Sequence, residues 1–408
     1  MGFGQGLSGL KSAAQKLDVI GNNIANSNTV GFKASSVSFA DVYATSRVGL
    51  GTQVAAINQD FTVGNLSVTG GEFDIAIDGP AGMFRVVDES GAVMYTRNGQ
   101  FSPNKEGYLV NAQGQYLTGY TFNQATQTYS TEPQRIRLPM GNIPPKATGT
   151  TAAGAGVLAG IEARGMNLDA REKVPTETPF KHSNPKSYNM SVPMTVYDSL
   201  GREHRLTQYF VKTADNNWTV HYQLDDDTPL AASHNIVFGT DGKITSATLS
   251  TTLNFPAANG AAPLTIPVTY TDATQFGGEF VYRFVQDGYA TGEYASMGVS
   301  ADGTIVANYT NGEMAEVGYI VLADFTNLQG LSPVGGNAWT QTADSGAPLL
   351  SRPGFNGMSK LMSQALEESN VDISTELVNM IITQRTYQAN AQSITTQSEM
   401  MQNLLNIR

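Results

Sequence analysis

The sequence predicts a multidomain chain, with all-β outer domains attached to an α-helical coiled-coil core formed by the N- and C-terminal segments. At both ends of the chain, apolar residues alternate between spacings of three and four, which is the pattern of a helical seam. Between the ends, turn dipeptides recur at short intervals and no helical period is sustained. The length of 408 residues allows several domains at a loose prior of about 150 residues each.

The N-terminal segment predicts a helix that is weak on its own. Its early glycines each cost about 1 kcal/mol relative to alanine inside a helix. The segment should therefore become ordered only when packing against a partner compensates for that cost. Its predicted seam consists of Phe3, Leu7, Leu10, Ala14, Leu17, Gly21 and Ile24.

The C-terminal segment predicts a second, longer helix. Asp372 and Ser374 are both candidate N-caps, and Glu376 falls in the first turn, where the helix dipole favours a negative charge. The predicted seam consists of Ile373, Leu377, Met380, Gln384, Tyr387, Ala391, Ile394, Ser398, Met401 and Leu405.

The other faces of the C-terminal helix are almost uncharged, whereas a solvated coiled coil normally carries Glu and Lys beside its seam. Amide and hydroxyl side chains suit a helix surrounded by copies of itself, because a charge there would face its own repeat. The alternative is a two-helix arm that is solvated on its outside. The predicted polymerisation interface consists of Leu7, Leu10, Ala14, Leu17, Ile24, Ile373, Leu377, Met380, Tyr387, Ala391, Ile394, Met401 and Leu405.

The middle of the chain predicts two nested β-domains. Dipeptides such as Asp78-Gly79 and Asn311-Gly312 supply the positive φ that tight hairpin turns need. Residues 141–156 are rich in Pro, Gly, Thr and Ala and predict a break between domains. The expected outer β-domain is 145–285, inserted in an inner β-domain of 73–144 and 286–355. Because the seam can be paired only by joining both ends, the terminal helices should form the innermost layer.

Composition weighs against nucleic-acid binding, membrane insertion and enzyme chemistry. The 35 Asp and Glu outnumber the 24 Lys and Arg, whereas phosphate binding draws on clustered cations. No stretch approaches the roughly 18 apolar residues of a membrane span, and no cleavable signal peptide is visible. Cysteine is absent, which removes disulfides and thiolate chemistry.

Two apparent ligand motifs have simpler explanations. Gly4, Gly6 and Gly9 spell GxGxxG, but a dinucleotide fingerprint needs a preceding strand, and only three residues precede this one. The aspartate run 225–227 lacks the spaced ligands of a calcium loop and is better explained as a solvated turn. The histidines never adopt the spacing of a helical metal pair. We therefore expect no catalytic residue, no metal and no cofactor.

Two terminal segments resemble the signatures of bacterial flagellar axial proteins, the rod and hook family. They are GNNIANSNTVGFK at residues 21–33 and LEESNVDISTELVNMIITQRTYQANAQSI at residues 366–394. Residues 69–79 and 95–120 resemble the family's shared β-rich domain, and residues 192–220 resemble the outer domain of its hook members. The positions that match the family motifs are Asn22, Asn23, Asn26, Thr29, Gly31, Phe32, Asn370, Val371, Asp372, Gln384, Arg385, Tyr387 and Asn390.

The resemblance implies a terminal helical core domain of residues 1–28 and 370–408, and a linking region of residues 29–72 and 356–369. It implies a structural subunit that self-assembles into the tubular flagellar hook, a flexible universal joint that transmits torque from rod to filament. The implied location is the basal body and hook, outside the cell, after export without a cleaved signal peptide.

Implied partners are copies of the chain itself, the rod, hook-cap and hook–filament junction proteins, and the type III export apparatus. The alternatives are a distal rod-like axial protein and, in a different class, a secreted carbohydrate-binding or adhesive β-protein.

Overall fold

A computed structural model describes residues 3–42, 49–124, 126–150, 159–225, 232–246, 249–257 and 259–406 of the chain. It divides into two compact units. Unit 1 comprises residues 1–140, 295–308 and 314–408, and unit 2 comprises residues 141–294 and 309–313. The two termini therefore fold together in unit 1, and unit 2 is an insertion within it.

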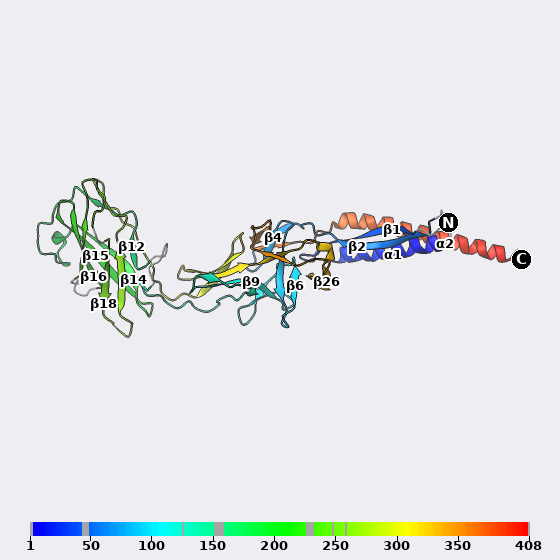
Figure 1. Cartoon of the computed structure of the whole chain (residues 1–408), viewed down its shortest axis with the longest axis horizontal. Helices are drawn as coiled ribbons and strands as arrows, with labels where there is room; N and C mark the ends of the chain where they lie inside the picture. Colours follow the sequence, from blue (N-terminus) through cyan, green and yellow to red (C-terminus); the bar gives the residue numbers. More distant parts are fainter. Residues whose placement is uncertain are drawn as a thin grey trace. The chain divides into compact units, whose positions relative to one another are not determined.

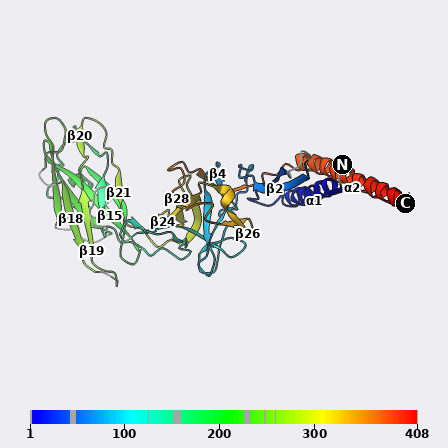
Figure 2. The same cartoon turned by 45° about the vertical axis from the view of Figure 1, so that its right-hand side comes forward.

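One end of unit 1 is built from both chain termini, and we call it the terminal core. Figures 1 and 2 show the two helices side by side, with a β-hairpin running along them. The hairpin strands pair antiparallel, with a bulge between Ser38 and Phe39. The elements of the terminal core are α1 (Phe3–Ala25), β1 (Ser35–Val42), β2 (Gly51–Gln59) and α2 (Ile373–Asn406).

The rest of unit 1 is a β-structure, which we call the β body. Its main sheet has the order β22-β23-β24-β9-β5-β6-β27-β26. The strands of this order are β5 (Met83–Val87), β6 (Val93–Thr96), β9 (Tyr116–Asn123), β22 (Tyr294–Val299), β23 (Thr304–Tyr309), β24 (Met314–Ile320), β26 (Ser332–Gly335) and β27 (Ala338–Thr340).

Shorter strands extend the β body. Strand β25 pairs with both β5 and β28, while two further pairs, β3–β30 and β4–β29, join early residues to late ones. These elements are β3 (Leu66–Val68), β4 (Ile75–Asp78), β7 (Ser102–Pro103), β8 (Leu109–Val110), β10 (Thr128–Tyr129), β11 (Gln134–Arg135), β25 (Leu322–Asp324), the 3-10 turn η2 (Leu328–Gly330), β28 (Leu349–Ser351), β29 (Lys360–Ser363) and β30 (Ala365–Glu367).

Unit 2 contains two four-stranded sheets, in the orders β14-β15-β16-β17 and β18-β19-β12-β21, that share one apolar core, and a smaller pair, β13–β20. Phe210 and Trp218 from the first sheet join Leu253 and Ile266 from the second in that core. Its elements are β12 (Ile161–Ala163), β13 (Asn167–Asp169), the 3-10 turn η1 (Pro185–Ser187), β14 (Met190–Tyr197), β15 (Glu203–Ala214), β16 (Asn217–Leu224), β17 (Ser233–Val237), β18 (Ser250–Phe255), β19 (Leu264–Thr269), β20 (Thr274–Phe276) and β21 (Phe284–Gln286).

The chain enters and leaves unit 2 along two adjacent segments. Ile143 donates its backbone N–H to the carbonyl of Gly292 (2.9 Å), and Lys146 and Tyr289 exchange backbone hydrogen bonds (3.0 and 2.9 Å). Because of this pairing, residues 141–144 and 286–294 fold with unit 2, although the sequence pattern assigned them to the inner domain. The predicted combination of β-domains with one helix at each terminus is confirmed.

Candidate functional site

Helix α1 buries a face that is offset from the predicted seam. Gly6, Ala13 and Ile20 recur every seven residues on the buried side, together with Ser12 and Asn23. The seven-residue period was predicted, but this face lies one position before the predicted one, a rotation of about 100°. The predicted residues are half-buried or exposed within the chain: Leu7, Leu10, Ala14, Leu17 and Ile24.

Glycine explains the offset, because it lets α2 approach α1 closely. A Cβ built on Gly6 would lie 3.0 Å from Cγ1 of Ile394, and one built on Gly9 would lie 2.9 Å from Nδ2 of Asn390. The sequence pattern weighted large apolar side chains and counted these glycines as a cost to the helix. Their spacing on the face next to Ala13 was the signal that could have identified the contact.

Helix α2 begins at a cap made by Asp372. Its carboxylate accepts the backbone N–H of Ser374 (3.0 Å) and the hydroxyl of Thr375 (2.6 Å), so Asp372, not Ser374, is the N-cap. The Thr375 hydroxyl and the Ser374 N–H hold the pKa of Asp372 below its usual value. The cap fixes where the long helix leaves the β body.

Helix α2 runs antiparallel to α1 in the same chain. Near one end of the pair Asn23 donates to Glu376 (3.4 Å), and near the other Ile394 lies over Gly6. Of the predicted interface residues, Met380, Ala391 and Ile394 are half-buried, whereas Ile373, Leu377, Tyr387 and Met401 are exposed. The side chain of Leu405 lies outside the described part of the chain. The chain's own fold therefore covers the predicted interface only in part: none of its described residues is fully buried.

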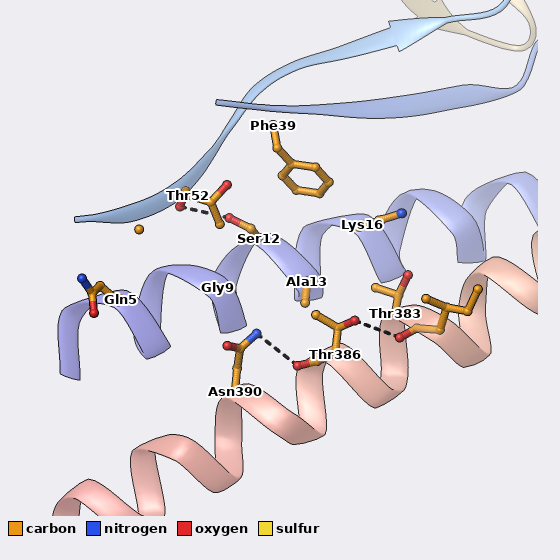
Figure 3. Close-up of a pocket in the computed structure, with 12 residues that line it drawn as sticks. Gln5, Gly9, Ser12, Ala13, Lys16, Phe39, Thr52, Thr383, Thr386 and Asn390 are labelled. Carbon is orange, nitrogen blue, oxygen red and sulfur yellow. Dashed lines mark hydrogen bonds between the residues drawn. The ribbon is translucent and has the colours of Figure 1, made fainter. Parts of the chain in front are cut away.

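The β1–β2 hairpin lies along α1 and covers one side of the helix pair (Figure 3). Ser12 donates its hydroxyl to the carbonyl of Thr52 (3.3 Å), and the backbone N–H of Thr52 donates to the hydroxyl of Ser8 (3.3 Å). A cavity of about 460 Å³ remains between α1, the hairpin and α2, as Figure 3 shows. We call this cavity the socket; it is lined by Gln5, Gly9, Ser12, Ala13, Lys16, Phe39, Gly51, Thr52, Ile382, Thr383, Thr386 and Asn390.

Asparagines of the two family motifs tie the helices to the linking strands. The amide of Asn23 pairs with the backbone of Ser35 in both directions, accepting its N–H (2.9 Å) and donating to its carbonyl (2.8 Å). The amide of Asn370 accepts the N–H of Ala34 and donates to the carbonyl of Asp60, both at 2.8 Å. Each side-chain amide thus makes the pair of backbone hydrogen bonds that a neighbouring strand would otherwise make. Asn suits these positions because its amide both donates and accepts.

The turn after α1 needs glycine at position 31. Gly31 has φ +69°, and a Cβ there would lie 2.6 Å from the backbone nitrogen of Asn98. Its own N–H donates to the carbonyl of Glu367 (2.8 Å). Before it, Asn26 accepts a hydrogen bond from the hydroxyl of Thr29 (3.2 Å). The first motif therefore forms the turn that carries the chain from α1 to β1 and packs it against the β body at Asn98.

A buried ionic triad lies at this joint. Glu367 accepts from the ammonium of Lys33 (2.5 Å), the guanidinium of Arg97 (3.1 Å) and the backbone N–H of Gly64 (3.0 Å), and the side chains of Lys33 and Glu367 are fully buried. Burial lowers the pKa values of Lys33 and Arg97, while the charge of Glu367 acts to raise them. Three segments distant in the sequence are thereby fixed to one carboxylate, a contact that no sequence pattern predicted.

The remaining motif residues lie on more open surface. Asn22 accepts a hydrogen bond from the amide of Asn26 (2.9 Å). Phe32 and Val371 are half-buried at the joint, and Asn390 faces Gly9. Gln384, Arg385 and Tyr387 are exposed on α2.

The described residues contain no cluster of three or more His, Asp or Glu that could hold a metal ion. Gly4, Gly6 and Gly9 are part of α1, so they form no phosphate-binding loop. Asp225 pairs with the imidazole of His204 (2.7 Å), and the other two aspartates of that run lie outside the described residues. No helix in the described part of the chain is long and apolar enough to cross a membrane.

The nested topology and the joined ends fit the expected axial protein, and comparisons with known proteins show the family. Family models match at residues 5–33 (flagella basal body rod protein), 76–159 (flagellar hook protein FlgE/F/G D1 domain), 167–289 (flagellar basal body protein FlaE D2 domain) and 362–407 (flagellar basal body rod FlgEFG protein C-terminal).

The chain is 43% identical over 414 residues to the flagellar hook protein FlgE of Escherichia coli K12, with all of both chains covered. It is 30% identical over 420 residues to FlgE of Brucella suis, covering 99% of this chain and 98% of that one. The crystal structure of Helicobacter pylori FlgE2 shares the fold with a TM-score of 0.52 at 16% identity, over 74% of this chain and 100% of that one. The chain therefore belongs to the flagellar hook protein family.

Membership makes the chain a structural subunit of the flagellar hook and not an enzyme, as predicted. The family implies homopolymeric assembly within the flagellum. Full-length identity to hook proteins decides against both alternatives, the rod-like protein and the secreted adhesive protein.

Proposed function

We propose that this hook subunit polymerises through its terminal core, and that the assembled tube is a flexible joint between rod and filament. The observation that carries this proposal is the uncovered apolar surface of α2, where Leu377 and Ile381 are 46% and 51% exposed. A surface of this kind marks an interaction site, because a soluble monomer rarely exposes a contiguous apolar patch to solvent. In a filament, one patch on each copy contacts a different patch on the next copy. This contact repeats along the filament without closing into a ring.

We assign four layers to the subunit. The terminal helical core, residues 1–28 and 370–408, would pack as a coiled coil at the inside of the tube. The linking region, residues 29–72 and 356–369, would carry force outward through the buried Glu367 triad. The inner β-domain, expected at 73–144 and 286–355, and the outer β-domain, expected at 145–285, would form successive shells. The paired crossing segments favour boundaries at 141 and 294 for the outer domain.

The seven-residue spacing of Gly6, Ala13 and Ile20 supports a coiled-coil packing of α1. The predicted seam residues on the other faces of both helices would then contact neighbouring copies. Rod, hook-cap and junction proteins, together with a type III export apparatus, are the partners proposed for such a subunit, which would work outside the cell.

Electron microscopy of the concentrated, purified chain tests the proposal. We expect tubes of one uniform diameter. A chain that stays monomeric over a wide range of concentration and salt would contradict self-assembly through its own surfaces. The matched control removes the helices at residues 1–28 and 370–408, and it should stay monomeric under every condition in which the full chain assembles.

A further inference from the structure

The first half of α2 is apolar on the side that faces away from α1. Ile373, Leu377, Val378 and Ile381 are 42%, 46%, 56% and 51% exposed. Successive helical residues are rotated by about 100°, so Ile381 lies on nearly the opposite side of the helix from the buried Thr383. We call these four residues the outward stripe. None of them carries charge, and nothing else in the described part of the chain covers them.

The socket is the concave counterpart on another face of the helix pair. In Figure 3, Phe39 from the hairpin lies above α1, and α2 closes the opposite side. The aromatic ring of Phe39 is 44% exposed, and Ala13 lies in the wall of the socket. Lys16 is the charged residue among those that line it.

Most polar side chains of the socket other than Lys16 are already engaged within the chain. The hydroxyls of Thr383 and Thr386 donate to carbonyls one turn earlier on α2 (2.7 and 3.0 Å), and the amide of Asn390 donates to the carbonyl of Thr386 (3.0 Å). Ser12 donates to Thr52. Apart from the ammonium of Lys16, the wall therefore offers mainly methyl and methylene groups. A neutral sugar would lose much of its hydration there with little replacement, whereas an apolar side chain would not.

A second copy of this chain is the occupant that these observations favour. The family assembles as a homopolymer, so every socket is presented to copies that carry an outward stripe. Stripe and socket are different patches, so their contact is heterologous and can continue from copy to copy. We propose that the outward stripe of one subunit inserts into the socket of the next, an assignment that rests on the proposed polymerisation and specifies its contact.

Disulfide trapping tests this contact directly, because the chain has no native cysteine. The variant is Leu377→Cys/Thr386→Cys, with one cysteine in the stripe and one in the socket. The two positions are nine residues apart on α2, about 13.5 Å by helical rise. A disulfide needs Cα atoms within about 7 Å, so no bridge can form within one chain.

Assembled tubes of this variant are treated with a mild oxidant and analysed on a denaturing gel without reductant. We expect a ladder of trimers and longer multimers, because each copy is linked to two neighbours. Each single variant should stay monomeric, and so should the control Leu377→Cys/Asp215→Cys, which places its second cysteine in an exposed hairpin of unit 2. If the test variant does not assemble, Ile373→Cys replaces Leu377→Cys.

Three results would overturn the contact while leaving polymerisation intact. They are tubes without a ladder, dimers formed by Leu377→Cys alone, which would mean stripe against stripe, and an equal ladder from the Asp215 control. Absence of tubes from the unaltered chain would instead refute the proposed function, and the contact with it.

Discussion

At the scale of single residues, Glu367 is the centre of the joint between helices and β body. Its single carboxylate pairs with two buried cations, Lys33 and Arg97, and also accepts the backbone N–H of Gly64. Three distant segments of the chain depend on this one carboxylate. Buried ion pairs often contribute little net stability, but loss of one partner leaves a charge without compensation.

Replacement of Glu367→Gln should therefore destabilise unit 1 by about 3–5 kcal/mol, because Lys33 and Arg97 remain buried with less countercharge. Chemical denaturation followed by Trp339 fluorescence, in a Trp218→Phe background, measures the change, since Trp339 lies in unit 1. The triple variant Lys33→Met/Arg97→Met/Glu367→Leu should recover most of the loss. An unchanged midpoint for Glu367→Gln would show that the triad does not hold the joint.

A second residue-scale prediction concerns pH and the core of unit 2. His234 is buried against Tyr270, its Nε2 has no hydrogen-bond partner among the described residues, and burial lowers its pKa. The folded state then keeps the imidazole neutral while the unfolded state gains a proton below about pH 6.5. Stability should fall as pH drops below that value, by at most about 1.4 kcal/mol per pH unit for one proton.

Substitution His234→Phe should remove this part of the acid sensitivity. Trp218 fluorescence in a Trp339→Phe background reports the unfolding of unit 2, where Trp218 is buried. The free energy of unfolding is measured for the variant and its parent at pH 7.5 and pH 5.5. The difference between their pH dependences reports His234 alone, because the other histidines are present in both proteins. The same pH dependence in both proteins would contradict the assignment.

At the scale of elements, the helices show what a sequence pattern can and cannot supply. The existence of both helices and the seven-residue period could be predicted, and the N-cap of α2 could be narrowed to Asp372 or Ser374, because these features depend on local spacing. The face that α1 buries could not, because it depends on how closely α2 approaches Gly6 and Gly9. The socket likewise needs a hairpin whose position no local pattern specifies.

The glycines of α1 give a matched test of that close approach. Gly9→Val places a branched side chain where Asn390 lies, so it should separate the helices and reduce tube formation strongly. Gly4→Ala meets nothing within 4 Å and removes a helix-breaking residue, so it should raise helix stability by up to about 1 kcal/mol and leave assembly intact. Sedimentation yield and helical circular dichroism compare the two variants. Equal yields would mean that the close approach is not needed.

A charge on the α1-facing side of α2 makes a second element-scale test. Ile394→Asp would put a carboxylate against Gly6, where no partner can compensate it, so α2 should detach and polymerisation should stop. The thermal transition of the β body should stay unchanged, because the buried cluster around Tyr95 and Trp339 contains no residue of α2. Gln392→Asp, at an exposed position of the same helix, is the control and should be mild. Equal loss of assembly in both variants would show that the side of α2 that carries the charge does not matter.

At the scale of the whole molecule, the chain is nested: both ends fold in unit 1, and unit 2 is inserted between them. The segments proposed to polymerise and the proposed outer domain therefore belong to different units. The sequence predicted an insertion because turn signals cluster between two helical ends. Its limits were harder to predict, because Ile143 and Gly292 pair across a separation of 149 in sequence without a local signature. Residues 309–313 also fold with unit 2, although they lie beyond its exit.

Removal of the insertion should leave the tube able to form. A deletion that joins Ile143 to Gly292 through a short Gly-Ser link needs little rearrangement, since their backbones are already hydrogen-bonded (2.9 Å). We expect tubes that are thinner and differ from the parent in curvature or stiffness. A deletion protein that folds but forms no tube would place essential contacts in the outer domain.

The central claim is that the two ends of the chain form the inside of the tube. A cryo-electron microscopy reconstruction of tubes assembled from the full chain tests it most directly. The account predicts two α-helices per subunit at the smallest radius, with the β body around them and residues 141–294 outermost. A channel wall built from β-structure, with the helices at larger radius, would contradict it.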